Sequence, residues 1–306
     1  MKQEMTKILV PVDFKEPSLR AAHQAAIIAR RLDVSLRLVY VIETPGILAQ
    51  FFSSADQLVK ITGQAKEKLF KLRASLKKET PGIKVKTRVE RGKPYEKILE
   101  LAAKTGVRLI ILGENHQCGN PDDELGTTVY HVTLKSKVPV LTLKGDFSKM
   151  NDKVIVPLDL TKKTREQLSA ALYLGLEHGT KIHLVSSLVG GINKEDSRIF
   201  KKLKEAKEGL EMNGVDCEME LFDRSEIPPF KRVLEYAKKT EAGMILLMTH
   251  QEGYTYDNYI GAFAHHILNL SEVSVLTITS LSKNMDLTPF FKAIVDPIGL
   301  FNVKGR

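Results

Sequence analysis

An internal repeat constrains this chain more than any other feature of its sequence. Three segments of the first half recur in the second half, the last two at a constant offset of 135 residues. The pairs are "KILVPVDFKEPS" at 7–18 with "KVIVPLDLTKKT" at 153–164, "PYEKILELAAKTGVRLIIL" at 94–112 with "PFKRVLEYAKKTEAGMILL" at 229–247, and "LGTTVYHVTLKSKVPVLTL" at 125–143 with "IGAFAHHILNLSEVSVLTI" at 260–278. This duplication predicts two consecutive copies of one domain fold.

Each copy alternates short apolar, β-branched runs with longer segments of helical spacing. In the first copy we expect strands at 7–12, 34–42, 83–90, 107–112 and 138–143, and helices at 16–32, 55–78, 94–105 and 125–135. Strands separated by helices require right-handed crossovers, which give a parallel sheet covered on both faces. The sequence therefore predicts an α/β protein with two tandem, doubly wound, Rossmann-like domains, each with five strands in the order 3-2-1-4-5. We place them at residues 1–146 and 152–280, with a C-terminal extension at 281–306.

Cysteine content and hydropathy predict a cytoplasmic protein. The chain has two cysteines, Cys118 and Cys217, far apart and without a CxxC pair, which argues for a reducing compartment. The start, "MKQEMTKILVPVDF", lacks the apolar core of a signal peptide, and no apolar run approaches the ~18 residues of a membrane helix. We therefore expect no membrane association.

The net positive charge of the chain comes entirely from its first half. Residues 1–150 hold 26 basic and 16 acidic side chains, a net charge of +10, whereas residues 151–306 have a net charge of −1. Such asymmetry suggests an anionic partner, although lysines on solvated helix faces account for most of it. Zinc-finger spacing, an RNP motif and tryptophan are all missing, so we expect no nucleic acid. A small phosphorylated ligand is the better interpretation.

The stretch "GENHQCGNPDDELGTT" at 113–128 has the position and chemistry of a phosphate site. In an open parallel sheet, the ligand crevice lies beyond the carboxyl ends of the strands where the strand order reverses, here between strands 1 and 4. Gly113 could take a positive φ or bring backbone close to a ligand. Gly126, Thr127 and Thr128 open a helix whose unpaired N–H groups favour an anion, although a helix cap explains the threonines about as well.

These residues resemble a known family, the universal stress proteins, whose nucleotide-binding members carry G-x2-G-x9-G-(S/T) after strand 4. This chain has the full spacing, but histidine replaces the second glycine. "ILVPVDF" and "VPVLTL" add to the resemblance, which covers both repeats. It implies an adenine nucleotide, ATP with or without Mg²⁺, whose phosphates lie at strand 4 and whose ribose and adenine lie near strands 1 and 2. The implied site residues are Pro11, Asp13, Val41, Gly113, His116, Gly126, Thr127 and Thr128.

Departures from the family pattern limit this expectation to the first repeat. His116 can adopt a left-handed backbone and donate to phosphate, or its side chain can fill the pocket. The second repeat has Met248, Gln251, Gly261 and Ala262 at the corresponding positions and loses both strand-proximal glycines and the hydroxyl. Asp159 remains there, but an acid after a strand commonly starts a turn. We therefore expect no nucleotide in the second repeat.

Competing functions have weaker support. A metal site would draw on His116, Cys118, Asp122, Asp123 and Glu124, but the tight paired spacing of zinc ligands is missing and a solvated loop is favoured. No G-x-S-x-G elbow or P-loop is present, so enzyme activity ranks below binding, with slow ATP hydrolysis the most we expect. A ligand-free interaction or scaffold protein of the same fold stays open as the alternative.

The last strands of the two repeats predict an internal assembly. "VPVLTL" at 138–143 and "VSVLTI" at 273–278 form apolar sheet edges in the assumed order, and Pro139 suits an edge. Single-repeat relatives in the resembled family dimerise through this edge. We therefore expect the two repeats to pair through these strands as a pseudo-dimer, with a further homodimer left open. The tail "LTPFFKAIVDPIGLF" at 287–301 is too apolar for a free polar extension, and we expect it to pack on protein.

Overall fold

A computed structural model describes residues 7–43, 55–114, 126–145, 152–160, 164–188, 194–249 and 261–279. Its contacts divide the chain into two compact units. The first comprises Met1–Lys149 with Leu268–Thr277, and the second comprises Met150–Ile267 with Ile278–Arg306. The segment 268–277 follows the second repeat in sequence but belongs to the first unit by its contacts.

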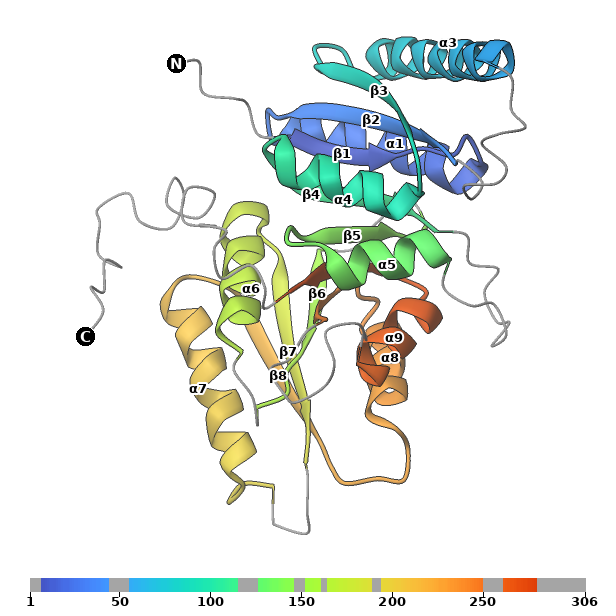
Figure 1. Ribbon diagram of the computed structural model, residues 1–306. Coiled ribbons are helices and arrows are strands. Elements are labelled where there is room, and N and C mark those ends of the chain that lie inside the picture. The colour runs from blue at the N-terminus through green and yellow to red at the C-terminus, as the bar shows by residue number, and fades with distance from the viewer. Residues whose placement is uncertain are drawn as a thin grey trace, which may run out of the picture. The chain divides into compact units, whose positions relative to one another are not determined.

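The first unit has the predicted alternation of strands and helices, with boundaries within a few residues of those expected (Figure 1). Its elements are β1 (Lys7–Pro11), α1 (Glu16–Arg31), β2 (Ser35–Ile42), α3 (Ala55–Glu79), β3 (Val85–Arg91), α4 (Pro94–Lys104), β4 (Val107–Gly113), α5 (Thr127–Lys135) and β5 (Val140–Leu143). Proline at the start of α1 and of α4 suits a first turn whose amides have no intrahelical partner.

The strands form a parallel sheet in the order β3-β2-β1-β4-β5, so the predicted fold class and strand order are confirmed for this unit. Helices α1 and α3 cover one face, and α4 and α5 cover the other (Figure 1). The strand order reverses between β1 and β4, which places the carboxyl ends of these two strands on either side of the expected ligand crevice.

Small side chains bring α1 close to the sheet. Five alanines of this helix are at most 1% exposed, at positions 21, 22, 25, 26 and 29. They pack against strands whose central residues are fully buried, such as Leu9, Ile110 and Ile111. Burial of this apolar surface is the main favourable contribution to folding, and the short alanine side chains set the narrow distance between α1 and β4.

A strand from the second repeat covers the last strand of this sheet. In β10 (Ser274–Ile278), residues Val275, Leu276 and Thr277 pair antiparallel with Thr142, Leu141 and Val140 of β5. All four residues of β5 are buried as a result. The pairing joins the two segments that the sequence predicts to pair, and it removes the open apolar edge that would otherwise invite aggregation.

The second unit repeats the pattern of the first. Its elements are β6 (Lys153–Pro157), α6 (Arg165–His178), β7 (Lys181–Ser187), α7 (Arg198–Met212), β8 (Cys217–Phe222), α8 (Pro229–Lys239), β9 (Met244–Met248) and α9 (Ala262–Leu270), whose last turn belongs to the first unit. The parallel strands lie in the order β9-β6-β7-β8. The strand order beside β6 therefore matches that beside β1.

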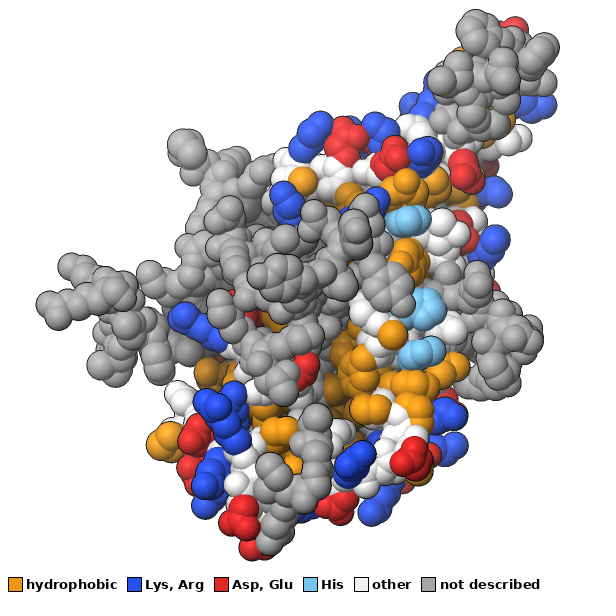
Figure 2. Space-filling model, turned by 60° about the horizontal axis from the view of Figure 1, so that its bottom comes forward, with side chains coloured by type: hydrophobic (Ala, Val, Ile, Leu, Met, Phe, Trp, Pro, Cys, Tyr) orange, Lys and Arg blue, Asp and Glu red, His pale blue; other side chains and the backbone are white. Residues whose placement is uncertain are grey.

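None of the helices in the described part of the chain combines the length and the apolar character of a membrane span. Charged side chains of both signs are interspersed on the face shown in Figure 2, rather than gathered in a field of one sign. The basic excess of the first half therefore does not appear on this face as a continuous basic patch.

Candidate functional site

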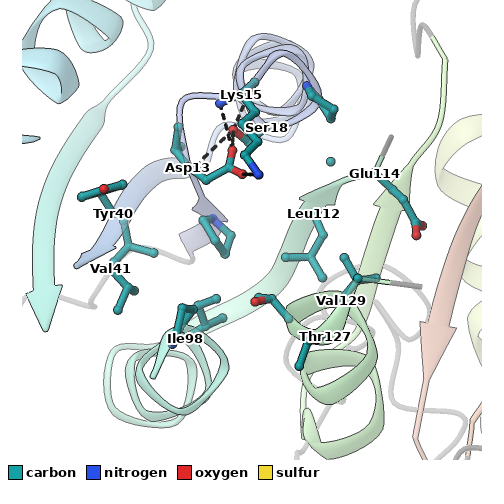
Figure 3. Close-up of a pocket in the computed structure, with 18 of the residues that line it drawn as sticks. Asp13, Lys15, Ser18, Tyr40, Val41, Ile98, Leu112, Glu114, Thr127 and Val129 are labelled. Atoms are coloured by element: carbon teal, nitrogen blue, oxygen red, sulfur yellow. Dashed lines mark hydrogen bonds and ion pairs between the residues drawn. The ribbon is translucent and has the colours of Figure 1, made fainter. Parts of the chain in front are cut away.

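A cavity of about 990 Å³ opens at the carboxyl ends of β1, β2 and β4. Its lining includes every described residue of the predicted site, namely Pro11, Asp13, Val41, Gly113, Gly126, Thr127 and Thr128. These residues come from four separate segments of the chain, and the crossover topology brings them together (Figure 3). His116, the residue that departs from the family pattern, lies outside the described residues.

The loop between β1 and α1 is held by Asp13. Its Oδ1 accepts a hydrogen bond from the Ser18 hydroxyl at 2.5 Å and another from the Lys15 backbone amide at 3.0 Å. The Asp13 amide donates to Ser18 Oγ at 3.2 Å. Between them, Phe14 takes a left-handed backbone with φ of 64°, which is unusual for a bulky side chain. Asp13 thus has a structural role, because it shapes one wall of the cavity. Its side chain is nevertheless 55% exposed.

Gly113 is required by packing, which differs from the reason that the sequence suggests. It is absent from the residues with positive φ. A Cβ at this position would lie 2.0 Å from the Pro17 carbonyl oxygen and 3.0 Å from the Ala21 Cβ. Of the two reasons that the sequence offers for Gly113, a positive φ is therefore not the one, and the close approach of α1 to β4 already excludes any side chain here.

Gly126 occupies the N-cap of α5, and among the described residues no side chain makes a capping hydrogen bond there. The Thr127 and Thr128 hydroxyls are therefore not explained as caps. A Cβ at Gly126 would meet no atom within 4 Å, so the space before the helix is open. Uncapped backbone N–H groups at a helix start carry a partial positive charge, which suits an anion.

The described lining holds four carboxylates, Asp13, Glu16, Glu43 and Glu114, against one cation, Lys15. The described lining is therefore net acidic, whereas residues 1–150 are net basic. The basic side chains of the first half do not gather at this cavity. The exposed Glu16 pairs with Arg20 at 3.3 Å. Burial raises the pKa of the Glu114 carboxyl to about 7, and the neighbouring Lys144 partly opposes that rise.

Sequence reasoning missed several residues of the cavity. Lys15 and Ser18 stand in the quoted segment at 7–18, and Glu114 directly follows Gly113, so proximity to the motifs was the available signal. Tyr40 precedes Val41 at the end of β2, and its ring lies 5.0 Å from that of Phe14. The apolar lining residues Ile98, Leu112 and Val129 belong to helical or strand patterns that indicate only a core.

In the second unit, the position of the strand reversal is bridged by a glutamine. Gln167 on α6 is fully buried, and its Nε2 donates to the Pro157 carbonyl of β6 at 2.8 Å and to the Leu246 carbonyl of β9 at 3.0 Å. Met248, at the position of Gly113, is 5% exposed. A side chain of the protein therefore joins β6 and β9 at this reversal.

The rival metal site cannot be located, because His116, Cys118, Asp122, Asp123 and Glu124 all lie outside the described residues. Within the described ranges, no three His, Cys, Asp or Glu side chains are grouped closely enough to hold a metal ion. His265 and His266 on α9 have ring centroids 6.0 Å apart, and His266 stacks on Phe230 at 4.3 Å. Their contacts are those of packed aromatic side chains.

Comparison with known families agrees with the motifs. Residues 4–144 match the model of the universal stress protein family. The chain is 31% identical over 142 residues to a universal stress protein of Methanocaldococcus jannaschii, an alignment that covers 45% of this chain and 81% of the relative. A universal stress protein of Bacillus subtilis is 24% identical over 145 residues, covering 45% of this chain and 98% of the relative.

A solved structure extends the likeness to both repeats. The crystal structure of a universal stress protein from Archaeoglobus fulgidus aligns with 90% of this chain and 99% of its own length, with a TM-score of 0.72. Sequence identity is 18% over this alignment, so it shows the fold. The alignment spans residues beyond the segment that matches the family model.

Proposed function

The chain belongs to the universal stress protein family, and we propose that its first repeat binds an adenine nucleotide, ATP, in a stress-response or signalling role. One observation carries the proposal: all seven described residues of the predicted site line a single open cavity at the strand reversal. Its volume of about 990 Å³ lies at the upper end of the range of small-molecule sites.

The placement of the nucleotide follows from the chemistry of the walls. The uncapped start of α5, with the Thr127 and Thr128 hydroxyls, suits the phosphates. The ends of β1 and β2, with Asp13 and Val41, suit the ribose and adenine, as the family resemblance implies. Because the described lining holds more carboxylates than cations, we propose that ATP binds as its Mg²⁺ complex, which neutralises part of the phosphate charge.

Nucleotide bound to the purified protein tests the proposal directly. The protein is denatured, released nucleotide is identified by mass spectrometry, and ATP binding is measured by equilibrium dialysis with Mg²⁺ or with EDTA. We expect one ATP per chain, bound more tightly with Mg²⁺. Two ATP per chain would contradict binding by the first repeat alone, and an absence of binding would favour the ligand-free scaffold.

Two glycines provide a matched pair of variants. A Cβ at either Gly126 or Gly261 would meet no atom within 4 Å, so the backbone surroundings of both positions accept the Cβ of an aspartate. Gly126→Asp places a carboxylate against the phosphates and should abolish binding through charge repulsion. Gly261→Asp makes the same change at the corresponding position of the second repeat and should leave binding intact. Equal effects of the two variants would refute the assignment to the first repeat.

We further propose that the two repeats act as an intramolecular pseudo-dimer through β5 and β10. The antiparallel pairing of Leu141 with Leu276, and of the residues on either side, supports this proposal. Two hydrogen bonds add to the ladder, because Thr277 Oγ1 donates to the Val140 carbonyl at 3.1 Å and the Lys144 amide donates to Ser274 Oγ at 3.1 Å.

A further inference from the structure

Two ionisable side chains, Glu114 of the cavity lining and Lys144 behind it, lie side by side. Gly113 of β4 pairs with Leu143 of β5, and the Glu114 amide donates to the Leu143 carbonyl at 3.3 Å. The next residues, Glu114 and Lys144, are therefore neighbours. Their side chains are 8% and 3% exposed, and Glu114 Oε2 lies 4.0 Å from Lys144 Nζ. This carboxylate oxygen is buried and accepts no hydrogen bond.

Lys144 is held in place by the segment that the second repeat contributes to the first unit. Its ammonium donates to the Leu268 carbonyl at 2.5 Å and to the Ser271 carbonyl at 2.9 Å, at the end of α9 and just beyond it. A cation at a helix C-terminus is favoured by the helix dipole. These bonds fix the ammonium 4.0 Å from Glu114, and burial keeps the pKa of the carboxyl raised to about 7 despite this charge.

The second repeat provides an internal comparison. The offset of 135 residues places Thr249 and Thr279 at the positions of Glu114 and Lys144. The backbone geometry is the same, because the Thr249 amide donates to the Ile278 carbonyl at 2.9 Å, and the two threonines are 3% and 4% exposed. The fold therefore tolerates neutral residues at these positions, and the ionisable pair occurs in the repeat whose strand reversal holds the cavity described above.

We propose that Glu114 makes nucleotide binding proton-linked, so that its carboxylate takes up a proton from solvent as the anionic phosphates of ATP enter the cavity. The proposal rests on the proposed function of the first repeat. Figure 3 shows the Glu114 side chain directed away from Asp13 and Thr127, so it acts on the ligand through charge and not through contact. The phosphates bring negative charge near the Glu114 carboxyl. Because like charges repel strongly around a buried group, this charge favours the neutral, protonated form of Glu114.

The described charged groups nearest to Glu114 come from two segments. Lys144 on the β5 side stabilises the carboxylate, whereas Asp13, Lys15 and Glu16 on the β1–α1 loop line the same cavity. Glu16 is 69% exposed, and Asp13 is 55% exposed and hydrogen-bonded to Ser18, so water screens the charge of both side chains. Among the carboxyls of the described lining, Glu114 is the buried one, and a new charge nearby acts most strongly on a group that water does not screen.

The direction of the pH dependence follows by linkage. Because ATP raises the pKa of Glu114 above its value of about 7 in the free protein, affinity is highest below this pH and falls as the pH rises through it. Each unit by which the ligand raises this pKa corresponds to about a tenfold change in Kd between the acidic and alkaline limits.

Calorimetry measures the proton directly. Binding of ATP with Mg²⁺ is recorded at about pH 7 in two buffers that differ in ionisation enthalpy, and the difference gives the protons exchanged. We expect uptake by the wild type and a clear loss of uptake in Glu114→Gln, whose remaining exchange reports the ionisation of ATP itself. Glu67→Gln, which removes an exposed carboxylate of α3 outside the cavity lining, should match the wild type.

The outcomes separate the two proposals. Tight ATP binding with the same proton exchange in the wild type and Glu114→Gln would overturn the role of Glu114 and leave nucleotide binding standing. Lack of ATP binding to the wild type would overturn both. Difference infrared spectroscopy of the wild type is independent of any variant: ATP should convert a carboxylate band into a protonated-acid band, and an unchanged carboxylate band would refute the proposal.

Discussion

Replacing Gly113 with alanine should destabilise the first unit, even without a ligand. The new Cβ would lie 2.0 Å from the Pro17 carbonyl oxygen and 2.5 Å from its carbonyl carbon, both of which are backbone atoms at the start of α1. The contact must therefore open by at least 1 Å before it reaches the 3.0 Å below which Cβ contacts essentially never occur. Because backbone cannot rotate away as a side chain can, α1 has to move relative to β4.

The expected loss of stability combines two effects. Overpacking of a filled core costs about 1–3 kcal/mol. Alanine also restricts the unfolded chain relative to glycine, which returns roughly 0.4–1 kcal/mol. The net loss for Gly113→Ala is therefore about 1–2 kcal/mol in the free energy of unfolding. For a unit of this size, that corresponds to a fall in Tm of roughly 2–8 °C.

Urea unfolding followed by circular dichroism measures this effect, with Gly126→Ala as the control. At Gly126 the φ of −53° suits alanine and the added Cβ meets no atom within 4 Å. Alanine is a poorer N-cap than glycine, but the entropy gain offsets this, so we expect a change within about 0.5 kcal/mol. If Gly113→Ala proves as stable as Gly126→Ala, the packing argument is wrong and the glycine is kept for the ligand.

Four further predictions concern the second repeat and the strand pairing. Gln167→Leu should lower the free energy of unfolding of the second unit by roughly 1–3 kcal/mol, because it leaves buried carbonyls unpaired, as denaturation would show. Burial lowers the pKa of His183. The free energy of unfolding should therefore reach its full value above about pH 6.5 and decrease at lower pH, where the unfolded state binds the proton more readily. His183→Gln should reduce this pH dependence in thermal melts. Burial raises the pKa of Cys217 to about 12, so thiol reagents should label it far more slowly in native than in denatured protein. Residues 1–146 alone should form dimers or aggregates by light scattering, because β5 then lacks its antiparallel neighbour, and a stable monomer would contradict the pairing.

The fold of the first unit could be predicted because its determinants are local or periodic. The repeat offset, the alternation of strands and helices, and proline at the start of α1 and α4 are all visible in the sequence. That the seven described residues line one cavity could be predicted because parallel topology sends the ends of β1 and β4 to the same edge. Neither inference needs knowledge of how two distant side chains pack.

Other features depend on contacts between distant residues. Gly113 is excluded from bearing a side chain by Pro17, almost a hundred residues earlier, and nothing around Gly113 in the sequence reports this. Glu114 stands among polar letters in "GENHQ", which indicate a solvated loop, yet the structure buries it beside Lys144. Its raised pKa follows from that burial, so it could not be derived from residue type alone.

The internal comparison also explains why a repeat persists after it has lost its glycines. Residues Leu268–Thr277 belong to the first unit by their contacts, and the buried ammonium of Lys144 depends on the carbonyls at the end of α9. Loss of the second repeat would therefore expose β5 and leave that ammonium without these acceptors, which is costly for a buried charge. At its own strand reversal, Gln167 supplies the hydrogen bonds to β6 and β9 from within the protein. The second repeat thus contributes a strand and a helix end to the first unit whether or not it binds a ligand of its own.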